Sequence, residues 1–284
     1  MENNPLIQQA EKIEKHARQG SINTRRDYKK SFRVFVKWLW ENYKVQHIKN
    51  ISNKHLEAFV EYQLAKGNKA TYITKILSAI RYYHDQVPRA RHELTCGNSS
   101  LGVPKREKPG DRAWTCEEYE RMKQEARDLN KLIFVSLFVL IWELGLRIHE
   151  AVRLYRVDIE RALANGALRV KGKTGKERDV PLTPVAETEL LKLKKDTPRG
   201  AKVFVKPGEK ADQVIKDIQD FIRKHREPRE GEKLTAHGLR YNYAQRELQE
   251  TKDQGETKEK AERTVSEKLG HKRRDIARGY ASWD

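Results

Sequence analysis

A short stretch at residues 96–110 constrains the fold most, because its composition is unsuited to a packed core. Glycine, proline, asparagine and serine dominate it, with Lys105, Arg106 and Lys108 among them. Such a composition is typical of a linker. A chain of 284 residues is long enough for two domains. We therefore expect one domain over residues 1–96, a basic linker over 97–111 and a second domain over 112–284.

The first domain has the apolar spacing of helices. In three stretches, apolar residues recur three or four positions apart, which is the period of a half-buried helix. Thr24 is the expected N-cap of the first helix, and Ser52 that of the second, which ends near Gly67. The third helix is expected over residues 70–83, before Pro88. Its apolar face consists of Ile73, Ile76, Leu77 and Ile80.

The second domain combines helices with a β-hairpin. Residues 132–142 are apolar except for Ser136, a run far short of the roughly 20 residues that span a bilayer, so they predict a buried helix over 132–144. Further helices are expected over 117–127, over 212–225 and from His237 onward. Residues 167–171 and 177–182 indicate two strands around a glycine-containing turn, and 201–205 one more short strand. The predicted fold is mostly α with a small β-hairpin, an α+β class.

The charge balance points to a polyanionic partner. Lysine and arginine number 59 against 41 aspartates and glutamates, which gives a formal net charge of +18. Nucleic acid is the commonest partner of so basic a protein. A lipid surface is disfavoured, because no basic terminal segment also has a clean apolar face.

The sequence also bears on location. Its start is polar and acidic and has no signal-peptide pattern. Cys96 and Cys116 are the only cysteines, too few for a zinc cluster, and they imply no disulfide. We therefore expect a cytoplasmic protein without membrane attachment.

Five short motifs in the second domain carry groups suited to one reaction. They are residues 145–150 (GLRIHE), 172–178 (GKTGKER), 237–240 (HGLR), 269–271 (LGH) and Tyr280. A tyrosine hydroxyl has a pKa near 10, so it needs a base to act as a nucleophile. Arginines bind phosphate oxygens through paired N–H groups and stay charged, and a lysine can protonate a leaving oxygen. Together these groups suit attack on a phosphodiester without a metal.

These motifs resemble the tyrosine recombinase (phage integrase) family in their order and nearly in their spacing. The helical first domain also resembles that family's core-binding domain, so the resemblance covers most of the chain. It implies a helical, DNA-binding N-terminal domain and a tyrosine recombinase catalytic domain, with no metal and no cofactor. It further implies a tetramer on two double-stranded DNA sites, exchanging strands through a Holliday junction.

The resemblance assigns roles to the polar residues of the motifs. Tyr280 would be the nucleophile and form a 3′-phosphotyrosyl bond, with His237 accepting its proton. Arg147 and Arg240 would bind the non-bridging phosphate oxygens. Lys173 would protonate the leaving 5′-hydroxyl.

Two further residues would support the site. His271 would hydrogen-bond the scissile phosphate, and Glu150 would orient an active-site cation and support the fold. Ordinary structural roles stay open for single residues: Arg147 and Glu150 have the spacing of an i,i+3 helix ion pair. Lys171 and Lys176 compete with Lys173 for its role.

Two rival motifs fail. Residues 149–153 (HEAVR) begin like the zinc-binding HExxH motif but end in Arg153, so the second metal ligand is absent. Residues 172–174 resemble the end of a phosphate-binding loop, but the required upstream glycine is missing and strands are expected on both sides. Neither motif predicts a metal or nucleotide site.

DNA contacts are expected on the polar faces of the N-terminal helices. Phosphate contacts supply affinity and register, so few of these side chains need to touch bases. For any single residue, a solvated basic face is the ordinary alternative. The candidate residues are Arg25, Arg26, Lys69, Tyr72, Lys75 and Arg81.

Three features depart from the family pattern. Tyr241 follows Arg240, where the family usually has a histidine. The charged segment 247–263 is expected to be a solvated helical excursion, and its part 249–263 an insertion. Only four residues follow Tyr280, so we expect Trp283 or the insertion to couple protomers, or the coupling to be weak.

The leading functional prediction is a site-specific DNA recombinase for integration or excision of a mobile element in a prokaryotic cell, associated with the nucleoid. An accessory DNA-bending protein is a further candidate partner. Two alternatives stay open: a type IB topoisomerase-like enzyme that relaxes DNA, and a catalytically inactive DNA-binding regulator.

Overall fold

The chain folds into two compact units, Met1–Glu107 and Lys108–Asp284. The computed structural model describes residues 4–18, 20–105, 110–172, 175 and 177–270. The division between the units lies inside the segment 97–111 that the sequence predicts as a linker. Each unit has a hydrophobic core of its own.

The first unit is helical in its described part. Its aromatic core includes Phe32 stacked on Tyr83, with ring centroids 4.8 Å apart, and Phe35 edge-on to Phe59 at 5.1 Å. The face predicted for the third helix is fully buried. The elements are α1 (Pro5–His16), α2 (Ile22–Tyr43), the 3-10 turn η1 (Ile48–Asn50), α3 (Asn53–Ala65) and α4 (Ala70–His84).

The start of α2 differs from the prediction. Ser21 is the N-cap, and its Oγ accepts a hydrogen bond from the backbone N–H of Thr24 at 3.2 Å. Thr24 therefore lies in the first turn of the helix. Both residue types cap helices well, so composition alone does not separate them. At α3 the predicted N-cap Ser52 is confirmed.

The chain that leaves α4 packs back onto the first unit. Leu101 and Val103 are buried in its core. Arg81 donates hydrogen bonds to the carbonyl oxygen of Cys96 and to Oδ1 of Asn98, both at 2.7 Å. The first part of the predicted linker is thus packed rather than free.

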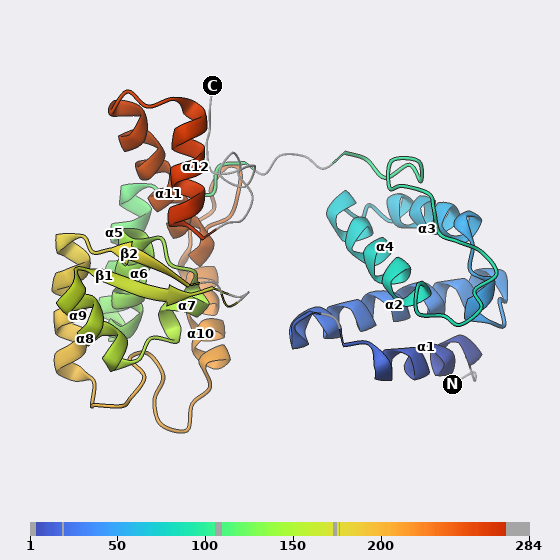
Figure 1. Ribbon diagram of the computed structural model, residues 1–284, viewed down its shortest axis with the longest axis horizontal. Helices are drawn as coiled ribbons and strands as arrows, with labels where there is room; N and C mark the ends of the chain where they lie inside the picture. Colours follow the sequence, from blue (N-terminus) through green and yellow to red (C-terminus); the bar gives the residue numbers. More distant parts are fainter. Residues whose placement is uncertain (1–3, 19, 106–109, 173–174, 176, 271–284) are drawn as a thin grey trace. The chain divides into compact units, whose positions relative to one another are not determined.

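The second unit is arranged around α6, which contacts α5, α7, α9 and α11 (Figure 1). The predicted buried helix and the Gly145 that ends it are both confirmed. No helix in the described ranges is both long and apolar enough to cross a membrane. The elements are α5 (Cys116–Asp128), α6 (Leu132–Leu144), α7 (Ile148–Val152), α8 (Arg156–Asn165), β1 (Ala167–Lys171), β2 (Glu177–Pro181), α9 (Pro184–Asp196), α10 (Ala211–His225), α11 (Ala236–Asp253) and α12 (Lys258–Lys268).

The predicted hairpin is confirmed, and the predicted third strand is wrong. β1 and β2 pair antiparallel, with Arg169 opposite Asp179. Residues 201–205 form only an isolated bridge between Lys202 and Tyr155. Residues 203–205 are consecutive buried apolar residues that fill the core, so they lack the alternation of a two-faced strand.

The charged segment 247–263 is helical, as predicted, but it is not wholly solvated. It forms the end of α11 and the first half of α12, and Ala261 is fully buried. Together with Val265, Ala244 and Leu248 it belongs to a small separate core. Most of its charged side chains are exposed, whereas Glu262 is buried, because one face of each helix supplies the apolar contacts.

Candidate active site

Arg147 is fixed at the point where α6 ends. Gly145 closes the helix in a left-handed conformation with φ of +57°. A β-carbon at this position would lie 2.3 Å from Cδ1 of Tyr243 on α11, so packing as well as backbone conformation requires glycine. Arg147 follows as the N-cap residue of α7. The glycine of the first motif therefore sets the position of its arginine.

Glu150 holds Arg147 from inside the fold. Its side chain is fully buried, and it accepts hydrogen bonds at 2.8 Å from the Arg147 backbone N–H and from Arg147 Nη1. Arg178 on β2 adds two more, at 3.0 Å and 2.8 Å. Burial by itself raises the pKa of Glu150, but the hydrogen bonds from Arg178 and Arg147 outweigh it and lower that pKa to about 2. Glu150 is therefore a charged anchor beneath Arg147.

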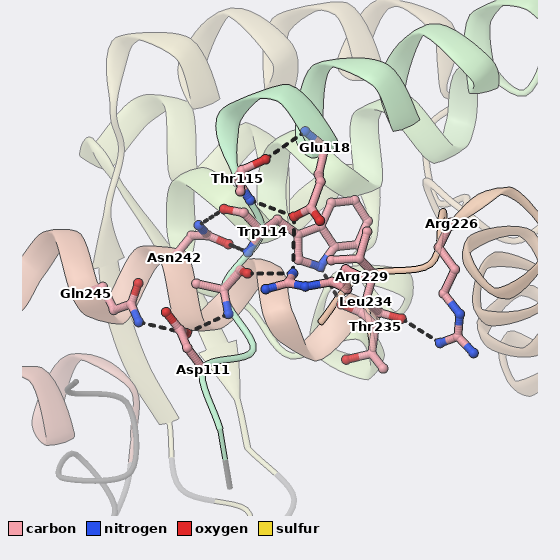
Figure 2. Close-up of polar contacts among 11 residues, drawn as sticks. Asp111, Trp114, Thr115, Glu118, Arg226, Arg229, Leu234, Thr235, Asn242 and Gln245 are labelled. Atoms are coloured by element: carbon pink, nitrogen blue, oxygen red, sulfur yellow. Dashed lines mark hydrogen bonds and ion pairs between the residues drawn. The ribbon is translucent and has the colours of Figure 1, made fainter. Parts of the chain in front are cut away.

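The HGLR motif begins α11, where Gly238 is required by close packing. A β-carbon there would lie 2.3 Å from the carbonyl oxygen of Arg112 and 2.6 Å from the Trp114 ring. Figure 2 shows Trp114 against the start of α11: its Nε1–H donates to the carbonyl of Thr235 at 2.9 Å, and its backbone N–H donates to Asn242 Oδ1 at 2.8 Å. The segment that enters the second unit thus holds the turn that carries His237.

Two arginines fix the loop between α10 and α11. Arg229 Nη1 donates to the carbonyl of Ala113 and to Oε2 of Glu118, both at 3.1 Å (Figure 2). Arg226 Nη1 donates to the carbonyl of Leu234 at 2.9 Å. The Arg226 bond joins the two ends of the loop, and the Arg229 bonds attach the loop to the segment around α5. The loop leads directly into the HGLR motif.

Arg240 joins two of the motifs from within. It is fully buried, and it donates to the carbonyl of Gly145 through Nη1 and to that of Leu269 through Nη2, the latter at 2.5 Å. The first motif and the LGH motif are thereby tied together. Such burial was not expected for a residue to which the resemblance assigns contact with phosphate oxygens.

A cavity of about 380 Å³ opens beside Arg147. Its apolar wall comes from α7, α10 and the start of α11. The polar groups are mostly basic, so the cavity suits an anion. They are Arg147, His149, Gln219, Arg223, Arg226, Thr235 and His237.

His237 lies at this cavity with an exposed surface. Burial by the surrounding protein still lowers its pKa to about 4, and the charges of Arg240, Arg112 and Arg147 act in the same direction. The imidazole is therefore neutral at working pH and able to accept a proton. Tyr241, in place of the family's usual histidine, is buried and packs edge-on against the His237 ring at 5.4 Å.

The structure brings together four of the predicted site residues, Arg147, Glu150, His237 and Arg240. Lys173, His271 and Tyr280 lie outside the described residues, as does Trp283. Of the LGH motif, the structure describes Leu269 and Gly270. The carbonyl oxygen of Leu269 accepts a hydrogen bond from Arg240. A β-carbon on Gly270 would lie 3.1 Å from Cδ of Arg178.

Sequence reasoning missed the site contacts of four basic residues, Arg178, His149, Arg223 and Arg226. A signal for Arg178 exists in the alternation of β2, since it lies on the same face of the strand as the buried Val180. An arginine on an inward face needs a buried carboxylate, which a sequence pattern does not identify. For the three residues that line the cavity, no local signal separates them from other surface cations.

The predicted DNA contacts in the first unit have different surroundings. Lys69, Tyr72 and Lys75 are exposed at the start of α4, and the Lys75 ammonium lies 5.4 Å from the Tyr72 ring centroid. Arg26 is exposed and Arg25 is half-buried on α2. Arg81 instead holds residues 96–98 through the two hydrogen bonds described above.

Comparison with known families gives two matches. The family described as "Phage integrase, N-terminal SAM-like domain" matches residues 15–90. The family described as "Phage integrase family" matches residues 113–284. A curated relative, the tyrosine recombinase XerD of Halalkalibacterium halodurans, is 26% identical over 287 aligned residues, which cover 94% of this chain and 89% of XerD.

Solved structures share the fold. The integrase of transposon Tn1549, in complex with transposon right end DNA, has a TM-score of 0.70 at 13% identity and covers 99% of this chain and 95% of its own. A lambda integrase tetramer bound to a Holliday junction has a TM-score of 0.67 at 18% identity, covering 100% and 80%. Both similarities concern architecture.

Proposed function

Because the chain belongs to the phage integrase family of tyrosine recombinases, we propose that it is a site-specific DNA recombinase acting through a 3′-phosphotyrosyl intermediate. The observation that carries the proposal is the basic cavity in which Arg147 and His237 meet, with the charge of Arg240 beside them. A phosphodiester is the anion that such a site would bind in a strongly basic protein.

Each group at the cavity has a role in this reaction. Arg147 is held by Glu150 on one side and lines the cavity, so it neutralises the phosphoryl oxygens. Arg240 adds a second positive charge, and its bonds to two motifs fix their relative positions. His237 is neutral and accepts the proton of the attacking hydroxyl.

The roles of the remaining residues rest on the motifs. Tyr280 attacks the phosphorus, the bond to the 5′-oxygen breaks, and Lys173 supplies the proton to that oxygen. His271 hydrogen-bonds the phosphate. Rejoining is the reverse attack by a 5′-hydroxyl on the phosphotyrosyl bond, which retains the energy of the broken backbone. No outside energy source is needed.

DNA binding is proposed for both units. Lys69, Tyr72 and Lys75 offer two cations and an exposed aromatic ring on one helix. In the second unit, Arg223 and Arg226 extend the basic cavity beyond Arg147. The neighbouring structures with transposon DNA and with a Holliday junction support duplex DNA as substrate and a tetramer as the working assembly.

Integration or excision of a mobile element is the proposed biological setting, supported by the similarity to a transposon integrase. We also retain the domain limits 1–96, 97–111 and 112–284 as functional limits. An accessory DNA-bending protein remains a proposed partner of the assembly.

A covalent trap tests the reaction without knowledge of the target site. A pool of random-sequence duplexes, each with a nick, is incubated with the full chain, and protein-linked DNA is recovered under denaturing conditions. We expect an adduct whose DNA is attached through a 3′-phosphate, and its loss in Tyr280→Phe. An adduct that persists in Tyr280→Phe, or none from the wild type, contradicts the proposal.

Two controls separate the alternatives. Efficient relaxation of supercoiled plasmid that lacks any enriched site favours a topoisomerase-like enzyme. DNA binding without any adduct favours an inactive regulator. Sequencing the trapped DNA identifies the cleavage site, and enrichment of one sequence supports site-specific action.

A further inference from the structure

We propose that Arg178 on β2 is a positioning residue that aims Arg147 at the cavity by sharing Glu150 with it. The catalytic consequence rests on the proposed function, whereas the positioning itself concerns only this chain. The hydrogen bonds through Glu150 therefore connect the β1–β2 hairpin to Arg147, the arginine proposed to bind the phosphate. Lys173 belongs to the segment that joins the two strands of this hairpin.

The four hydrogen bonds to Glu150 use all of its acceptor sites. Oε1 accepts from Nη1 of Arg147 at 2.8 Å and from Nη1 of Arg178 at 3.0 Å. Oε2 accepts from the Arg147 backbone N–H and from Nη2 of Arg178, both at 2.8 Å. A carboxylate has about four lone-pair sites, so this one is saturated.

Because the acceptor sites of Glu150 are filled, its carboxylate can accept only one hydrogen bond from the Arg147 side chain. With Arg178 present, Glu150 binds one amino group of the Arg147 side chain, and Arg147 still lines the cavity. Without Arg178, Glu150 would have one arginine left, and a bidentate pair between them would be the favoured geometry. The Arg147 guanidinium would then turn from the cavity toward Glu150.

The burial of this group shows that it is no surface ion pair. The Arg178 side chain is 8% exposed and that of Glu150 is 0% exposed, whereas Arg147 keeps 24%. Two arginines and one carboxylate leave one positive charge in excess. The exposed member is Arg147, so the excess charge is available where an anion enters.

Arg178 also contacts the LGH motif. A β-carbon on Gly270 would lie 3.1 Å from Cδ and 3.2 Å from Nη1 of Arg178, which is a tight contact, and the φ of +67° also favours glycine here. Leu269, the preceding residue, accepts a hydrogen bond from Arg240. Arg178 thus touches both the Glu150 motif and the residue before His271, which a surface arginine would not do.

The same hairpin offers a matched control. Arg169 on β1 forms a bidentate pair with Asp179 on β2, at 2.9 Å and 3.0 Å. The chemistry and the strand pair are the same, but the two side chains are 69% and 53% exposed. Substitution at Arg169 therefore removes an Arg–carboxylate pair from this hairpin without touching Arg147.

The experiment compares Arg178→Met and Arg178→Lys with Arg169→Met and Arg169→Lys in the full chain. Single-turnover adduct formation is measured on the nicked duplex pool, together with DNA affinity. We expect Arg178→Met to slow adduct formation by about 100-fold, because a small misplacement of a catalytic group has that cost. Arg178→Lys keeps the charge but loses the planar fork, so we expect partial rescue. DNA affinity should change little, and the Arg169 variants should match the wild type.

A second measurement needs no DNA chemistry. The Nε–Hε signal of Arg147 in a ¹⁵N NMR spectrum is assigned by its loss in Arg147→Lys. It should shift in both Arg178 variants and stay in place in both Arg169 variants. If Arg178→Met does not fold, Arg178→Lys supplies the comparison.

The two proposals fail separately. If the wild type forms no adduct, the proposed function is wrong, and the NMR comparison alone decides the positioning. If the wild type forms an adduct and the Arg178 variants equal the Arg169 variants in rate and in the Arg147 signal, the positioning proposal is overturned.

Discussion

At the scale of single residues, one buried carboxylate organises the site. Glu150 accepts four hydrogen bonds from two arginines, and these lower its pKa to about 2. The sequence motif indicates that Glu150 and Arg147 are close, because they are three positions apart. The second arginine, Arg178, comes from a strand 28 positions away in sequence.

Removing the charge of Glu150 should destabilise the second unit. Breaking a buried ion pair costs about 3 kcal/mol or more, so we expect Glu150→Gln to lower the free energy of unfolding by that amount at pH 7. The folded-state pKa is depressed, so this stabilisation is present above pH 4.5 and lost as the pH falls toward 2. Urea unfolding at several pH values measures the free energy of unfolding of the wild type and of Glu150→Gln.

The pH dependence of the stability difference decides whether the charge of Glu150 is its source. The difference between wild type and Glu150→Gln should shrink as the pH falls from 4.5 to 2, and a difference that stays constant would show that the charge is not its source. Asp179→Asn is the control, because Asp179 is an exposed carboxylate on the same hairpin and should leave stability unchanged.

The neutral state of His237 predicts a pH profile. Its pKa is about 4, so the imidazole stays deprotonated between pH 5.5 and 7. Protonation of His237 should therefore not reduce the rate of adduct formation between pH 5.5 and 7. The variant His237→Asn should form the adduct about 10²-fold more slowly, or slower still, at every pH. Single-turnover rates give the profile. A loss of rate near pH 6.5 that disappears in His237→Asn would refute a neutral His237.

At the scale of elements, the start of α11 depends on one close packing contact. Residues 111–118 cross this helix start, and Gly238 is the position where the two segments meet. The contact links the beginning of the second unit to the first turn of α11, which carries His237. Its tightness makes the glycine a structural requirement rather than a consequence of helix formation.

Adding one methyl group at this point should be costly. In Gly238→Ala the new β-carbon would lie 2.3 Å from the Arg112 carbonyl oxygen, and overpacking of this kind costs about 1–3 kcal/mol. We expect a lower free energy of unfolding and a change in Trp114 fluorescence. Gly110→Ala is the control, since its β-carbon would have an ordinary contact at 3.4 Å with Glu232. Equal stability of the two variants would contradict the packing argument.

At the scale of the whole molecule, charge dominates. The net charge of +18 gives long-range attraction to a polyanion that no single contact provides. Binding of duplex DNA releases counterions, so the affinity falls with added salt in proportion to the number of phosphates contacted.

The salt dependence locates the DNA-binding surface. We expect Lys69→Ala and Lys75→Ala together to lower the slope of log affinity against log salt by about 1.8, since each phosphate contact contributes about 0.9. Fluorescence anisotropy with a duplex at several salt concentrations measures the slope. Lys37→Ala is the control, an exposed lysine beside Glu41 on α2. A slope unchanged in the double variant would remove these two lysines from the interface.

The sequence by itself determined the features that depend on near neighbours. The helix over residues 132–144 and its end at Gly145, the hairpin, and the N-cap Ser52 all follow from periods and caps within a few positions. Family membership was equally readable, because the motifs preserve order and residue type along the chain. Even so, the choice between Ser21 and Thr24 as a cap was missed, since both residue types fit.

Only the tertiary structure decided which residues from distant parts of the sequence contact each other. The pairing of Arg178 with Glu150, the full burial of Arg240 between Gly145 and Leu269, and the packing of residues 203–205 into the core all join distant segments. A period or a cap records what a residue needs, such as burial or a partner. Which partner satisfies that need depends on how the elements pack, because the free energy of a buried charge is set by the groups that surround it in space.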